Sequence, residues 1–164
     1  MGIKLDNVSE TMLITLYMRA TDAKSEKPIL NDKKSEEIIS QIDYDFSKFK
    51  HAWASYYGVL SRAKMMDNEV KKFMKKYPDC VIVSIGCGLD TRFLRIDNGK
   101  IRWYNLDLPE VIEKRKLFFE PHKRVIDIAK SAFDQAWTKD IKLEGKKLLI
   151  ISEGVLMYFE EQQI

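Results

Sequence analysis

The chain has 164 residues, 45% of them hydrophobic and 32% charged, with a formal net charge of +3. This composition predicts one soluble globular domain, and basic residues scattered among acidic ones disfavour a nucleic-acid-binding protein. No apolar run approaches the roughly 20 residues of a membrane span, and no signal-peptide core is present. We therefore expect a cytoplasmic protein that binds neither membranes nor nucleic acid.

The first helix is predicted from a capped start at residues 7–10, followed by apolar residues at helical spacing as far as Ala20. A polar break leads to a second short helix that begins near Asp32. Residues 43–55 are open to two interpretations, a loop or a turn of helix. The N-terminal part of the chain is thus expected to be helical.

The third helix has the strongest pattern in this half of the chain. It is predicted from about Tyr56 and ends before Pro78, since proline commonly follows a helix end. Its apolar face recurs at helical spacing: Tyr57, Leu60, Ala63, Met66, Val70, Phe73, Met74 and Tyr77.

The second half of the chain alternates between strand-like and helical patterns. Apolar runs at 81–85, 101–106, 124–128 and 147–152 have the length of buried strands. Helical patterns lie between them, one starting at Pro109 and one at about 134–141. Strand, helix, strand in alternation predicts an α/β fold with a mostly parallel sheet and right-handed crossovers.

The first strand ends in Gly86-Cys87-Gly88, a turn in which a ligand can approach the backbone closely. Asp107, 21 residues after Gly86, ends the second strand. An acid at that offset can accept hydrogen bonds from the two hydroxyls of a ribose. Together the turn and the acid indicate an adenosine-binding site.

The rest of the glycine motif selects among adenosine cofactors. Thr91 stands where a dinucleotide site has its third glycine, and Asp90 places a negative charge near the expected phosphates. Repulsion disfavours a pyrophosphate, and hence a NAD-dependent dehydrogenase. A carboxylate suits S-adenosyl-L-methionine, which carries an ammonium and a sulfonium. Cys80 and Cys87 have no histidine nearby, so we expect buried, reduced cysteines and no metal site.

Three segments, residues 84–92, 103–112 and 152–159, resemble the motifs of the leucine carboxyl methyltransferase family, which includes O-methyltransferases of polyketide biosynthesis. The resemblance implies a Rossmann-like class I methyltransferase sheet that binds S-adenosyl-L-methionine, without metal. It also implies a single domain, with residues 1–77 as a helical cap over the cofactor's end of the sheet and 78–164 as the cofactor-binding half. Family members continue beyond the point that matches Ile164, so we expect a sheet truncated after strand four, in the order 3-2-1-4.

The resemblance also suggests which residues bind the cofactor. Gly86 and Gly88 would pass beneath its methionine part, Asp107 would hold the ribose, and Ser131 with Ala132 would bracket the adenine. The remaining candidates are Arg62 for the carboxylate, Asp90, and Glu153 beside the reacting centre. No catalytic residue is assigned.

Several of these candidates have a purely structural alternative. Asp90 and Ser131 are good helix caps, and Arg62 and Glu153 suit an exposed surface. Thr91 and Arg92 are equally suited to bracing the turn.

The expected reaction is attack of an oxygen on the methyl group of S-adenosyl-L-methionine, which yields S-adenosyl-L-homocysteine. The acceptor is a carboxyl, phenolic or hydroxyl oxygen of a small molecule or of a peptide C-terminus. The alternative is a non-catalytic cofactor-binding or interaction module. An uncovered fourth strand would further favour a homodimer formed along its edge.

Overall fold

The computed structural model describes residue 3 and residues 10–160. It forms two compact units, which we describe separately. The first contains the described part of residues 1–69 together with 89–95, and the second contains residues 70–88 and the described part of 96–164. Helix α3, Trp53–Lys76, contributes residues to both.

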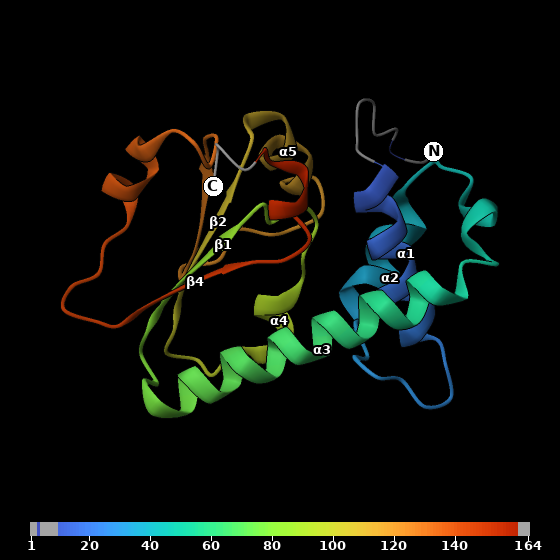
Figure 1. Cartoon of the computed structure of the whole chain (residues 1–164), viewed down its shortest axis with the longest axis horizontal. Helices are drawn as coiled ribbons and strands as arrows, with labels where there is room; N and C mark the ends of the chain where they lie inside the picture. The colour runs from blue at the N-terminus through green and yellow to red at the C-terminus, as the bar shows by residue number, and fades with distance from the viewer. Residues whose placement is uncertain (1–2, 4–9, 161–164) are drawn as a thin grey trace. The chain divides into compact units, whose positions relative to one another are not determined.

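The first unit is helical, as predicted. Helix α1, Glu10–Ala23, packs against helix α2, Lys33–Gln41, shown in blue in Figure 1. Asp32 caps α2, because its carboxylate accepts a hydrogen bond from the Ser35 amide at 3.2 Å. The predicted cap of the first helix, at residues 7–9, lies outside the described residues.

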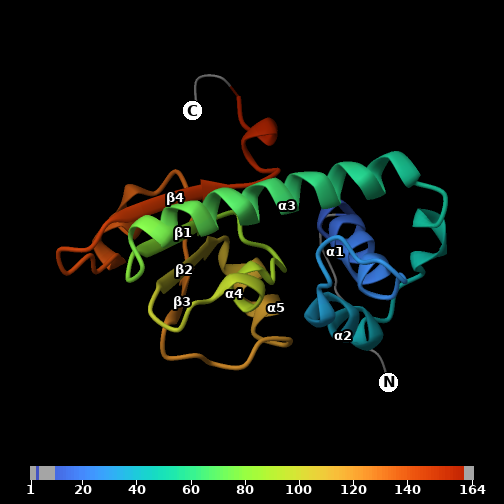
Figure 2. The same ribbon diagram turned by 90° about the horizontal axis from the view of Figure 1, so that it is seen from below.

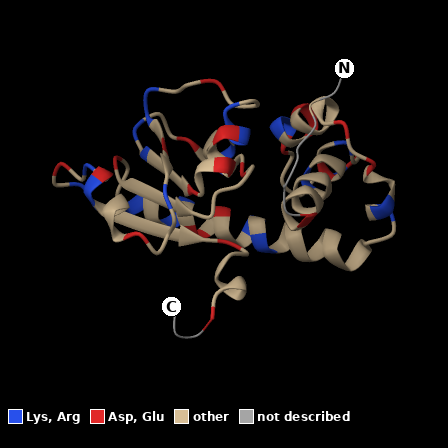
Figure 3. Ribbon diagram, turned by 90° about the horizontal axis from the view of Figure 1, so that it is seen from above, with Lys and Arg blue, Asp and Glu red and all other residues tan. Residues whose placement is uncertain are grey.

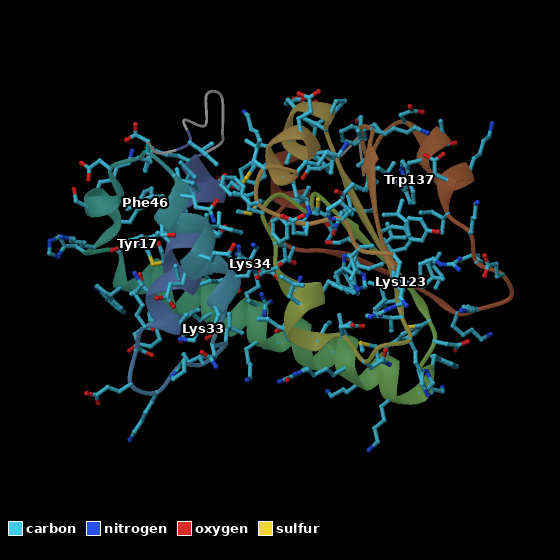
Figure 4. The ribbon with its side chains drawn as sticks, turned by 180° about the vertical axis from the view of Figure 1, so that it is seen from behind. Tyr17, Lys33, Lys34, Phe46, Lys123 and Trp137 are labelled. Carbon is cyan, nitrogen blue, oxygen red and sulfur yellow. The ribbon has the colours of Figure 1, made fainter. Side chains whose placement is uncertain are left out.

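The segment with two possible interpretations, 43–55, contains a short 3₁₀ helix, η1, Phe46–Phe49, and the start of α3. An aromatic cluster fixes η1 against α1. The rings of Tyr17 and Phe46 stack with centroids 5.6 Å apart, and both are labelled in Figure 4. Tyr44 and Phe49 complete the cluster. Buried aromatic area, rather than helical propensity, thus orders this segment.

The second unit is built on a four-stranded parallel sheet in the order β3-β2-β1-β4, which confirms the α/β fold class and the predicted strand order (Figure 2). The strands are β1 Val81–Ile85, β2 Arg102–Asp107, β3 Val125–Ala129 and β4 Leu148–Ser152. Ile85 is in register with Leu106 and with Ser152. The segments that follow these strands therefore meet at one edge of the sheet.

The helices that connect the strands are short. Helix α4 covers Arg92–Ile96 and helix α5 covers Pro109–Arg115. The predicted helix at 134–141 is a 3₁₀ helix, η2, Gln135–Asp140, and Asp134, not Ser131, caps it. A last 3₁₀ turn, η3, Leu156–Tyr158, follows β4.

The core of the second unit forms on both faces of the sheet. On one face, Ala132, Trp137 and Ile141 pack against a cluster of buried strand residues: Val81, Val83, Tyr104, Leu106 and Ile128. Trp137 lies beside these strands in Figure 4. Cys80 and Cys87 are buried, as predicted, and neither takes part in a disulfide.

One aromatic residue of the predicted apolar face of the third helix does not pack in the interior. Tyr57 on α3 is exposed. Basic and acidic residues are interspersed over both units (Figure 3). Among the described residues, no helix is both long and apolar enough to cross a membrane.

Candidate functional site

The glycine turn after β1 adopts the left-handed backbone conformation that favours glycine. Gly86 has φ +64° and Gly88 has φ +44°. The amide of Gly86 donates to the Leu106 carbonyl at 2.8 Å, which ties the turn to the end of β2. A Cβ on Gly86 would lie 2.3 Å from Cγ2 of Val155. Packing against the segment after β4 therefore already requires glycine here, independently of any ligand.

Asp107, at the end of β2, organises the same turn. Its Oδ2 accepts a hydrogen bond from the Gly88 amide at 2.8 Å, and its Oδ1 accepts one from the Leu108 amide at 2.8 Å. Burial is the largest influence on this carboxyl and raises its pKa. Each oxygen keeps a further lone pair, so the carboxylate can still accept hydrogen bonds from two ligand hydroxyls.

Ser131 and Ala132 lie in a turn after β3. This turn is held by a hydrogen bond to the end of β2. The amide of Lys130 donates to the Asp107 carbonyl at 3.0 Å. Ser131 Oγ accepts from the Phe133 amide at 3.2 Å, and the Ala132 carbonyl accepts from Nε1 of Trp137 at 3.1 Å. The two residues thus follow the carboxyl end of β3 with a fixed backbone.

Glu153 follows the last residue of β4 and is half-buried. The neighbouring Ser152 Oγ is buried without a hydrogen-bond partner in the described part of the chain. The second unit therefore gathers six of the candidate positions at or after the carboxyl ends of its strands, where open α/β sheets bind their ligands. They are Gly86, Gly88, Asp107, the 131–132 pair and Glu153.

The other two candidates, Asp90 and Arg62, belong to the first unit. Asp90 Oδ1 accepts from the Arg92 amide at 3.0 Å and from Nη1 of Arg19 at 3.1 Å, while Oδ2 accepts from Nη1 of Arg92 at 2.8 Å. The helix-capping alternative for Asp90 is therefore realised. Arg62 is exposed on α3, which matches its surface alternative.

Around Asp90, the first unit contains a buried charge network that the sequence analysis missed. Asp67 binds Arg92 at 2.6 Å and Arg95 at 3.0 Å, and Arg95 also contacts Asp32 at 3.1 Å. Burial alone would raise the pKa of Asp32, but Arg19 and Arg95 outweigh it and the pKa is lowered. The acids come from positions far apart in the sequence and resemble surface charges. Only the bracing alternative for Arg92 pointed to the network.

A second missed residue lies in the second unit. Arg115, at the end of α5, is only 4% exposed, and its Nη1 donates to the Gly88 carbonyl at 2.9 Å. Its place in the last turn of a short helix suggested a surface charge. The one available signal in the sequence was a basic residue in the helix that begins at Pro109, directly after the strand that ends in Asp107.

Comparison with known proteins gives consistent similarities. The family model described as "Leucine carboxyl methyltransferase" matches residues 12–164. The "Tetracenomycin polyketide synthesis O-methyltransferase TcmP" of Streptomyces glaucescens is 33% identical over 160 residues, which are 97% of this chain and 59% of that protein.

Two fungal proteins are also similar. The "S-adenosyl-L-methionine-dependent methyltransferase dpfgK" of Gibberella zeae is 30% identical over 99% of this chain and 59% of its own length. "Leucine carboxyl methyltransferase 1" of Debaryomyces hansenii is 32% identical over 44% of the chain and 21% of its own length. The chain thus spans about three fifths of the length of the first two relatives.

Proposed function

This chain belongs to the leucine carboxyl methyltransferase family, and we propose that it is an S-adenosyl-L-methionine-dependent O-methyltransferase or the cofactor-binding part of one. The observation that carries the proposal is the pairing of Asp107 with the Gly88 amide at the carboxyl edge of the sheet. It joins an acid suited to a ribose with a turn suited to close backbone approach.

The polar groups at the carboxyl edge of the second unit's sheet fit an adenosyl ligand. Asp107 offers two acceptor oxygens, which suit the two hydroxyls of a ribose. Gly88 has no side chain, so ligand atoms can approach the backbone of the turn there, whereas Val155 packs against Gly86. Ser152 Oγ, buried without a partner in the described part, is a further polar group at this edge.

S-adenosyl-L-methionine, when bound, supplies a methyl group on a positively charged sulfur. The chain's own residues then act by position and charge. Asp107 holds the ribose, and Ser131 and Ala132 bracket the adenine. Glu153 places negative charge beside the reacting centre. Fixing donor and acceptor in line supplies most of the rate enhancement expected for such a transfer.

The acceptor is proposed to be a carboxylate or an acidic phenol, of a small molecule or of a peptide C-terminus. A carboxylate is already ionised and needs no general base, whereas a neutral hydroxyl benefits from one. No histidine is among the candidate site residues. Relatives named for polyketide and for leucine carboxyl methylation support both acceptor classes.

The reaction is tested by incubating the chain with S-adenosyl-L-methionine carrying a tritiated methyl group and two acceptor panels, peptides with free C-termini and polyphenols. Methyl esters release volatile label in mild alkali, whereas phenolic ethers do not, so one treatment separates the classes. Label in either product supports the proposal. Cofactor binding without transfer to any acceptor would favour the alternative, a non-catalytic cofactor-binding module. An absence of binding would refute the proposed function and favour an interaction module.

The same proposal covers location and assembly. We place the protein in the cytoplasm, since buried cysteines outside any disulfide suit a reducing compartment. We also propose a homodimer formed along β4. This strand lies at the edge of the sheet, and its Ile150 is 48% exposed.

A further inference from the structure

Gly88 is held from both sides by side chains of opposite charge. Its amide donates to Oδ2 of Asp107 at 2.8 Å, and its carbonyl accepts from Nη1 of Arg115 at 2.9 Å. Glycine at φ +44° has many alternative conformations of similar energy. Two charge-assisted hydrogen bonds select one of them.

Arg115 is itself fixed by a buried polar relay. Its Nε lies 3.8 Å from Oδ1 of Asp127, and that oxygen accepts a hydrogen bond from Nδ2 of Asn105 at 2.8 Å. Asn105 in turn accepts from Nε1 of Trp103 at 2.8 Å. The relay connects the Gly88 carbonyl to side chains on β2 and β3, inside the second unit.

Arg115 also has an aromatic neighbour. Its guanidinium lies over the ring of Phe119, 3.9 Å from the centroid, and the residue is 4% exposed. A hydrophobic side chain of similar length would fill this space without the cost of burying a charge. Arginine differs from such a side chain because its planar guanidinium can interact with a carbonyl and a carboxylate at the same time.

We propose that Arg115 is a positioning residue of the cofactor site, which holds the Gly88 carbonyl so that the glycine turn keeps the conformation that receives the ligand. The proposal rests on the proposed function, because it assumes that this turn binds S-adenosyl-L-methionine. Arg115 acts through Gly88 and needs no contact with the ligand.

The chain offers a matched control. Arg124 also bridges an acid and a backbone carbonyl, since its Nη1 donates to Asp97 at 2.6 Å and to the Ile101 carbonyl at 3.1 Å. It precedes β3, so it lies at the amino edge of the sheet, away from the glycine turn. Arg115→Met and Arg124→Met therefore remove similar interactions at opposite ends of the strands.

The experiment measures the dissociation constant of S-adenosyl-L-homocysteine by calorimetry and the melting temperature of each variant without ligand. We expect Arg115→Met to weaken binding at least tenfold, as losing a hydrogen bond from a charged donor implies. Arg115→Lys, which keeps a cationic donor, should recover part of the affinity. Arg124→Met should bind within twofold of the wild type even where its melting temperature falls as far as that of Arg115→Met.

Three results separate the hypotheses. If the wild-type chain does not bind S-adenosyl-L-homocysteine, the proposed function fails. If it binds and Arg115→Met binds within twofold of it, the positioning role alone is refuted. Equal losses of affinity in Arg115→Met and Arg124→Met also refute it, because the effect is then general destabilisation. If Arg115→Met does not fold, Asp127→Asn decides: affinity reduced about threefold or more supports the role, and unchanged affinity overturns it.

Discussion

The carboxylate of Asp107 and the amide of Gly88 are joined by a hydrogen bond of 2.8 Å, between the end of β2 and the turn after β1. The bond gives Asp107 two tasks, since the acid proposed to bind the ribose also shapes the turn beneath the ligand. Binding and local structure are therefore coupled at this residue, and substitutions have to be chosen to separate them.

Asp107→Asn keeps the size of the side chain and one acceptor oxygen but removes the charge. We expect it to weaken S-adenosyl-L-homocysteine binding by about 1.5–3 kcal/mol, as for losing hydrogen bonds to a charged acceptor. The control is Asp97→Asn, because Asp97 pairs with Arg124 at the amino edge of the sheet. Calorimetric titration of both variants measures the effect, and an unchanged dissociation constant in folded Asp107→Asn would refute the ribose role.

The affinity should also depend on pH in a defined direction. Burial raises the pKa of Asp107 and outweighs the hydrogen bonds from the Gly88 and Leu108 amides and the charge of Arg115, which lower it. A raised pKa means that the carboxylate takes up its proton at a higher pH than an ordinary aspartate. The affinity for S-adenosyl-L-homocysteine is therefore highest above this pKa and falls as the pH drops through it. The fall begins at a higher pH than it would for an aspartate of ordinary pKa. Affinity that stays constant until the chain unfolds in acid would contradict a role for the ionised carboxylate.

The glycine turn can be tested through its neighbour Val155. Gly86→Ala forces a side chain into a left-handed conformation, at about 1–2 kcal/mol, and against the Val155 methyl groups. Val155→Ala removes those methyl groups. The double variant should thus be less destabilised than the two single variants added together, as measured by urea unfolding. Strict additivity would show that the predicted steric overlap is absent.

The buried network of the first unit is expected to be a major source of its stability. Asp67 is 4% exposed and Arg92 is 2% exposed. Asp67→Asn removes a buried counter-charge from both arginines, although Arg92 keeps Asp90 and Arg95 keeps Asp32, and it should lower the free energy of unfolding by about 3–5 kcal/mol. Lys34→Met, which breaks the surface pair with Glu37, should lower it by less than about 1 kcal/mol. Denaturant titrations that give equal losses for the two variants would rule out the network as a stabilising element.

The exposed apolar side chains of β4 predict self-association. Ile150 and Leu148 are 48% and 37% exposed, on a strand paired to β1. Ile150→Lys should shift the chain toward the monomer in light scattering across the micromolar range. Leu117→Lys changes a residue exposed beyond α5 and serves as the control. A wild-type chain that is monomeric at all these concentrations would disprove the dimer.

The sequence predicted the sheet because strand signals are local. Apolar runs flanked by Gly86, Pro109 and Gly145 located all four strands to within a residue or so, and the alternation with helices implied parallel order. The helix at 134–141 was only partly right, since its apolar spacing reflects Trp137 packing on the sheet rather than an extended α-helix.

The candidate site was predictable only where a motif stands at the end of a strand. Gly88 and Asp107 meet as expected because the glycine turn follows β1, Asp107 ends β2, and these two strands are paired. Arg115 and Asp67 were missed. A buried charged residue can be identified only from its interaction partners, and here those partners are distant in the sequence.

The central claim, that the carboxyl edge of this sheet binds the adenosyl part of a methyl donor, is tested most directly by calorimetric titration of the wild-type chain. Two ligands are compared under identical conditions, S-adenosyl-L-homocysteine and NAD. The account predicts saturable binding of one S-adenosyl-L-homocysteine per chain and no heat from NAD. Binding of NAD with equal or higher affinity, or binding of neither ligand by the folded chain, would contradict it.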